Sequence, residues 1–93
     1  MAKSILQNEK VCYVCGRTYN LHKHHIFGGA NRNTSERNGF TVYLCAYHHN
    51  LSNEGVHFNR TLDLDIKKQC QAEYEKTYKR EEFMKLIGKN YLD

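Results

Sequence analysis

Two short metal-binding clips constrain the fold of this chain more than any other feature. The first clip is Cys12-Tyr-Val-Cys15, and the second is Cys45-Ala-Tyr-His48. Two residues between ligands let both side chains reach one ion, and three thiolates with one imidazole form a tetrahedral zinc set. Structural zinc contributes folding free energy directly, which a chain of 93 residues needs because its hydrophobic core is small. We therefore predict a single domain, 1–93, with a structural Zn²⁺; unpaired core cysteines are the alternative.

The charge distribution and the cysteines indicate a class of partner and a compartment. The chain has no apolar run long enough to span a membrane and no signal-peptide pattern. We therefore expect a soluble protein of the cytoplasm, where reduced cysteines bind metal. The net charge is +4, and the whole excess lies in residues 1–60, which hold seven Lys/Arg and three acidic residues. Nucleic acid fits this half as a partner, although a basic surface that serves only solubility has the same composition.

Hydrophobic periodicity predicts two strands between the clips. Alternation along residues 19–27 predicts the first strand, in which His24 and His25 point to opposite faces unless the chain bends. The segment 28–35 is rich in glycine and asparagine, and we expect it to be a loop. The β-branched and aromatic residues of 40–44 predict a second strand, antiparallel to the first, that returns the chain to the first clip.

Helices are predicted after the second clip. A short helix is expected over 46–53, and it places His48 and His49 on different faces of one turn. From residue 62 onward, apolar residues four apart predict one long or two consecutive helices, with a break near Lys79 and an end at Gly88. Cys70 lies on the apolar stripe, so we expect a buried thiol rather than a reactive one.

Histidines outside the zinc set form a second group. His24 and His25 are adjacent, His49 follows the last zinc ligand, and His57 lies further along the chain. A lone histidine pair is usually exposed and without a special role. Here the remaining histidines stand close to the zinc ligands at two separate places, so we predict that they form a second, catalytic metal centre.

A histidine pair, a glycine loop, a strand and Cys-x2-His-His follow one another in this chain. In order and spacing they resemble the HNH (His-Me finger, ββα-metal) nucleases, in particular small phage-type HNH endonucleases with a zinc-binding double knuckle. The resemblance covers about residues 12–58, and the C-terminal helices are similar to those that follow the motif in the phage proteins. It implies an α+β fold with a zinc-stabilised ββα-metal core over about 12–58, followed by one or two helices over about 61–88.

The resemblance also implies residue roles. His25 matches the general base that takes a proton from the attacking water. The family's asparagine matches Asn38, which stands two residues further from the second clip than is common. The implied ligands of the catalytic divalent ion are His24, His49 and His57. Asn53 is the alternative for the last of these ligands.

The function that the resemblance implies is metal-dependent hydrolysis of DNA phosphodiester bonds, with Mg²⁺ or Mn²⁺ as the catalytic ion. Imidazole, with an ordinary pKa of ~6.5, suits proton abstraction from water at cellular pH. Basic side chains near the histidines are expected to contact DNA phosphates; they are Lys23, Arg32 and Arg37. By analogy with phage proteins, the chain is expected in the cytoplasm of a bacterial host, with the packaging terminase as a further partner.

Two other functions fit the same zinc set. A zinc-finger module that binds nucleic acid without cutting it uses the knuckle and the basic half, but it has no need for three further histidines beside them. A zinc domain that binds other proteins has no use for the basic excess. Cleavage of DNA is therefore the favoured prediction.

Overall fold

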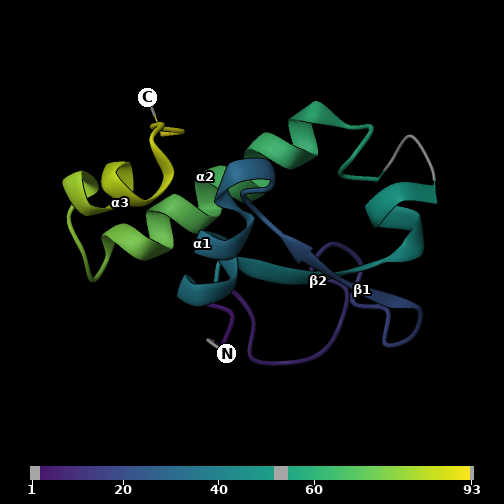
Figure 1. Ribbon diagram of the computed structural model, residues 1–93. Coiled ribbons are helices and arrows are strands. Elements are labelled where there is room, and N and C mark those ends of the chain that lie inside the picture. Colours follow the sequence, from purple (N-terminus) through teal and green to yellow (C-terminus); the bar gives the residue numbers. More distant parts are fainter. Residues whose placement is uncertain (1–2, 52–54, 93) are drawn as a thin grey trace.

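The computed structural model describes residues 3–51 and 55–92, which form a small α+β protein (Figure 1). Two strands, β1 (Leu21–His25) and β2 (Thr41–Cys45), make an antiparallel sheet. The helical elements are η1 (Gly29–Asn31), α1 (Arg32–Asn38), η2 (Tyr47–Leu51), α2 (Arg60–Glu75) and α3 (Arg80–Ile87). Within the described residues, no helix is long and apolar enough to cross a lipid bilayer. The predicted α+β class is confirmed.

The register of the two strands sorts their side chains onto two faces. His24 lies opposite Val42 and His22 opposite Leu44, so these four side chains share one face of the sheet. Val42 and Leu44 are fully buried, and His24 is buried beside them. One face of the sheet therefore packs into the core, and the side chains of His24 and His22 lie on that same face, on β1.

The connection between the strands differs from the predicted loop over 28–35. A 3₁₀ turn occupies Gly29–Asn31, and α1 begins at Arg32. The buried Ser35 hydroxyl donates to the carbonyl oxygen of Phe27 at 2.7 Å and accepts from the Phe27 amide at 3.2 Å. Ser, Thr and Asn are weak helix formers, so local composition favoured a loop. The hydrogen bonds from Ser35 to Phe27, which lies two residues after β1, outweigh that preference.

Gly39 ends α1 and allows the N-terminal segment to approach β2. Its φ is +74°, in the left-handed region, and a Cβ placed there would lie 2.1 Å from the carbonyl oxygen of Lys3. Residue 39 must therefore lack a side chain for two separate reasons, one of conformation and one of space.

We expect Gly39→Ala to lower the melting temperature by at least about 4–8 °C. A left-handed conformation costs a residue with a Cβ roughly 1–2 kcal/mol, and the displacement of Lys3 adds to that cost. Gly28→Ala is the matched control, because Gly28 has a φ of −92° and nothing lies within 4 Å of a Cβ there. Thermal unfolding followed by circular dichroism measures both variants, and equal melting temperatures would contradict this account.

The C-terminal helices close the core, as predicted. α2 and α3 are separated near Lys79, and α3 ends at Gly88 in the left-handed conformation. Phe83 of α3 is fully buried and its ring lies 6.1 Å from that of Phe40. Cys70 of α2 is also fully buried, and burial raises the pKa of its thiol to about 12, so it is a packing residue.

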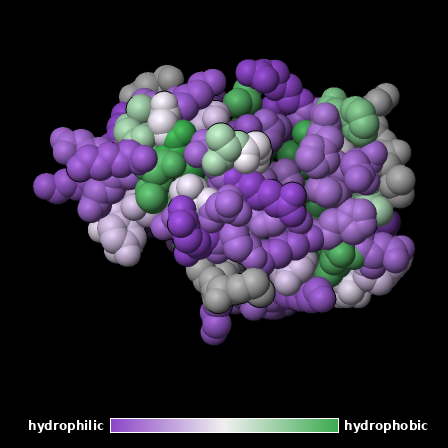
Figure 2. Space-filling model, viewed as in Figure 1, coloured by the Kyte–Doolittle hydropathy of each residue, from purple (hydrophilic) through white to green (hydrophobic). Residues whose placement is uncertain are grey.

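Hydrophilic residues cover most of the face shown in Figure 2, with apolar side chains in small groups.

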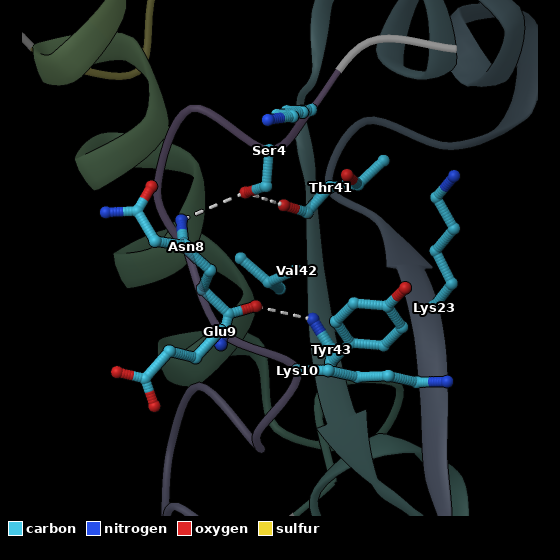
Figure 3. Close-up of a pocket in the computed structure, with 10 residues that line it drawn as sticks. Ser4, Asn8, Glu9, Lys10, Lys23, Thr41, Val42 and Tyr43 are labelled. Carbon is cyan, nitrogen blue, oxygen red and sulfur yellow. Dashed lines mark hydrogen bonds between the residues drawn. The ribbon is translucent and has the colours of Figure 1, made fainter.

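The N-terminal segment 3–10 lies along β2 (Figure 3). The Ser4 hydroxyl donates to the carbonyl oxygen of Thr41 at 2.5 Å, and the amide of Tyr43 donates to Oε1 of Gln7 at 2.7 Å. A groove of about 500 Å³ lies between this segment and the sheet. The segment thus satisfies backbone groups on a strand edge that would otherwise be open.

Candidate metal centres

The two predicted clips meet in one cluster of four ligands. One ligand atom from each of Cys12, Cys15, Cys45 and His48 lies within 4.8 Å of all the others. The sulfurs of Cys15 and Cys45 are 3.8 Å apart, and Nδ1 of His48 is 3.3 Å from the Cys45 sulfur and 3.9 Å from that of Cys12. Tetrahedral zinc with ordinary bond lengths places two sulfurs about 3.8 Å apart, and a sulfur and a nitrogen about 3.6 Å apart. The cluster therefore fits a zinc ion.

Backbone hydrogen bonds shape the first clip and attach it to the sheet. The amide of Gly16 donates to the carbonyl oxygen of Cys12 at 2.8 Å, and the amide of Cys12 donates to that of Arg17 at 2.8 Å. The amide of Tyr13 donates to the carbonyl oxygen of Tyr43 at 2.8 Å, which joins the turn to β2. Because β2 ends in Cys45, the same strand delivers the second clip.

The pKa values of the thiols are consistent with a metal cation bound between them. Burial of Cys12 opposes its ionisation, but backbone N–H groups of Cys45, Cys15 and Val14 stabilise the thiolate and lower the pKa from 9.0 to about 6. The Arg17 N–H lowers the pKa of Cys15, yet burial and the neighbouring sulfurs outweigh it and raise that pKa. Cys12 ionises readily, and its negative charge then opposes ionisation of Cys15. A divalent cation would remove this repulsion.

Three histidines form a second cluster, as predicted. Ligand atoms of His24, His49 and His57 all lie within 4.8 Å of one another. Nε2 of His57 is 3.1 Å from Nε2 of His49, and the ring centroid of His24 is 5.4 Å from that of His49. His24 lies in β1 and His49 lies in η2. The His57 amide donates a hydrogen bond of 3.2 Å to the His49 carbonyl oxygen, which holds His57 beside His49.

The histidine cluster fits a metal ion in its chemistry. His24 is only 7% exposed, and among the described residues its Nε2 is the one buried side-chain nitrogen or oxygen without a hydrogen-bond partner. Burial, followed by the nearby imidazoles, lowers the pKa of His24 to about 3 and that of His49 to about 4. Both rings are therefore neutral near pH 7, which is the state that binds metal.

His25 lies beside this cluster and contacts a carboxylate. His24 and His25 both line a cavity of about 420 Å³, although they are neighbours in β1. Nε2 of His25 is 3.3 Å from Oε2 of Glu36, and Nζ of Lys23 is 2.8 Å from the same oxygen. The hydrogen bond from Lys23, with a smaller contribution from His25, lowers the pKa of Glu36. An anionic carboxylate from α1 is thus held against one nitrogen of His25.

The structure gathers only some of the predicted phosphate contacts and catalytic residues. Arg32 and Lys23 line the histidine cavity, whereas Arg37 is not among its lining residues. Asn38 is not among them either; it ends α1, and its Nδ2 donates to the Thr34 carbonyl oxygen at 2.8 Å. We leave Asn38 out of the proposed site for that reason. Asn53 lies outside the described residues.

Sequence reasoning missed several residues of this site. Glu36 lies between the predicted loop over 28–35 and the predicted strand over 40–44, where no element is expected, and only the formation of α1 brings it to β1. Asp63 and Lys67 of α2 also line the cavity, and they form an ion pair of 2.9 Å. His22 lies against His49, and its position two residues before His24 in a predicted strand was a usable signal, because alternate strand residues share a face.

No family model matches the chain, and neither does any curated protein or solved structure with which it was compared. The chemistry of the two clusters is therefore the basis for assigning a function.

Proposed function

We propose that this protein is a metal-dependent endonuclease that hydrolyses DNA phosphodiester bonds, of the HNH kind that its sequence resembles. One observation carries the proposal: three imidazoles converge within 4.8 Å, and His25 and Arg32 line the same cavity as they do. A phosphodiesterase needs an ion site, a base and a phosphate grip close together. A zinc module that only binds nucleic acid also needs basic side chains for the phosphates, but it needs neither a second ion site nor a general base.

The two clusters would hold different ions. The Cys/His cluster would hold a structural Zn²⁺, since its four protein ligands leave no open position. His24, His49 and His57 would hold a divalent ion with open positions, which supplies stabilisation of the negative charge on the phosphate and the leaving oxygen when bound. Imidazole ligands favour Mn²⁺ over Mg²⁺, so we expect stronger activity with Mn²⁺ at low concentrations of metal.

His25 would act as the general base through Nδ1. Its Nε2 faces Glu36, so an N–H at Nε2 donates to the carboxylate and leaves the lone pair on Nδ1 to accept a proton from water. The anionic Glu36 would then stabilise the imidazolium that forms and hold the ring in place. Lys23 pairs with Glu36 and lowers the pKa of its carboxyl group, so Lys23 would have a supporting role here and would not be a free contact for DNA.

A plasmid assay tests the proposed function. Protein loaded with zinc is incubated with supercoiled plasmid, with Mg²⁺, with Mn²⁺ or without added divalent ion, and His25→Ala purified in parallel controls for contaminating nucleases. We expect nicked or linear plasmid only where wild-type protein and a divalent ion are both present. Binding of DNA without cleavage under every condition would instead support the zinc-finger module.

Arg32→Ala should weaken DNA binding and reduce its dependence on salt. Arg32 is exposed and lines the histidine cavity, so it would contact a phosphate near the scissile bond. Loss of one phosphate contact should reduce the slope of log K against log salt by about 0.9. Arg37→Ala is the matched control on the same helix, because Arg37 is exposed but does not line the cavity. Fluorescence anisotropy at several salt concentrations measures both, and equal slopes would contradict the placement of DNA over the cavity.

A further inference from the structure

His22 contacts the histidine cluster from outside. Its Nδ1 lies 2.9 Å from Nδ1 of His49, and the two rings meet edge to face with centroids 5.0 Å apart. β1 places His22 on the same face as His24, whereas η2 supplies His49. Neither the four-ligand zinc set nor the three-histidine cluster includes His22.

The two nitrogens of the His49 ring face different neighbours. Nε2 lies 3.1 Å from Nε2 of His57, inside the cluster, and Nδ1 lies against His22. A neutral imidazole carries one N–H and one lone pair. If the lone pair on Nε2 is to bind an ion, the proton of His49 must be on Nδ1. That N–H then points at Nδ1 of His22, which must accept it.

We infer that His22 is the positioning residue for His49: it accepts the Nδ1–H hydrogen bond of His49, which fixes the tautomer that presents Nε2 to a divalent metal ion. Histidines that bind metal usually donate their second N–H to an acceptor, and loss of the acceptor typically lowers metal affinity by about 10–100-fold. A neutral imidazole that serves as this acceptor is itself protonated at Nε2. The pair therefore has one defined arrangement of protons.

This inference deepens the proposed function, since it concerns the same cluster, but it depends only on metal binding and not on cleavage of DNA. The two can fail separately. A protein that binds metal as described but never cuts plasmid would contradict the nuclease and leave the role of His22 intact.

Metal titration tests the role of His22. Protein with zinc in the Cys/His cluster is titrated with Ni²⁺ by calorimetry, as wild type and as three variants at position 22. His22→Ala and His22→Leu should bind Ni²⁺ about 10–100-fold more weakly, because neither offers an acceptor to His49. His22→Asn should stay close to wild type, since its carboxamide oxygen can stand near the position of Nδ1. Circular dichroism and zinc content check that each variant is folded.

Three results would overturn the inference. Wild-type affinity in His22→Ala would mean that no acceptor is needed. Wild-type affinity in His22→Leu alone would mean that His22 only fills space. Equal loss in His22→Asn and His22→Ala would mean that His22 is itself a ligand or acts in some other way.

Nitrogen NMR of the wild-type protein gives a second test that needs no variant. With Zn²⁺ in the histidine cluster, the imidazole spectrum should show a proton on Nδ1 of His49 and on Nε2 of His22. A proton on Nδ1 of His22 would sink the inference, because that nitrogen could not then accept from His49. This measurement stands even if every substitution of His22 prevents folding.

Discussion

Replacing His25 with alanine is expected to slow DNA cleavage by about 10²–10⁴-fold, which is the usual contribution of a positioned general base. The variant loses the only proposed proton acceptor for the attacking water. It keeps the three imidazoles of the histidine cluster, the Cys/His cluster and the exposed Arg32. DNA affinity, Ni²⁺ affinity and melting temperature should therefore stay near the wild-type values. Single-turnover cleavage of a labelled duplex at saturating metal measures the rate.

His24→Ala provides the comparison that separates the base from the ligands. His24 is buried and its Nε2 lacks a partner among the described residues, so we propose it as a ligand of the divalent ion. This variant should lose both Ni²⁺ affinity and cleavage, with partial recovery of cleavage at high Mn²⁺. His25→Ala should not recover in this way. Wild-type cleavage by His25→Ala, or unfolding of that variant, would rule out the proposed role of His25.

Replacing Cys45 with serine is expected to abolish the folded state. Cys45 is fully buried at the end of β2, and its sulfur lies near ligand atoms of both Cys15 and His48. Structural zinc sites contribute roughly 10–16 kcal/mol of binding free energy, and whole domains are stable by only about 5–15 kcal/mol. Loss of the site can therefore remove the entire stability of so small a protein. Circular dichroism and zinc analysis of purified protein measure the result.

Cys70→Ala is the matched control for the cysteine substitution. Cys70 is also fully buried, but it lies in α2 and is not among the four clustered ligands. Cys70→Ala should lose some packing contacts and some stability. It should retain one zinc per chain and the helical signal in circular dichroism. A folded, zinc-containing Cys45→Ser protein, or loss of zinc in Cys70→Ala, would contradict the assignment of the ligands.

The three imidazoles that cluster could be selected from the sequence, but the residues that contact them could not. His24, His49 and His57 can be selected because only a few residue types bind metal ions, and these three histidines do not belong to the predicted Cys/His cluster. Glu36 and His22 did not, since carboxylates and imidazoles near a site gain a role only from the direction in which the backbone presents them. Asn38 was selected by its place in a motif, and α1 instead turns its amide toward Thr34.

The sequence by itself determined the Cys/His cluster, the two strands and the C-terminal helices. In each case the signal is local: ligands two residues apart, β-branched runs, or apolar residues with a helical period. Only the tertiary structure decided that α1 begins at Arg32, within the predicted loop, because the bonds of Ser35 to Phe27 join segments whose mutual placement no local pattern records. The same holds for the contacts of Glu36 with His25 and of His22 with His49, where hydrogen bonds of about 3 Å depend on how α1, β1 and η2 pack.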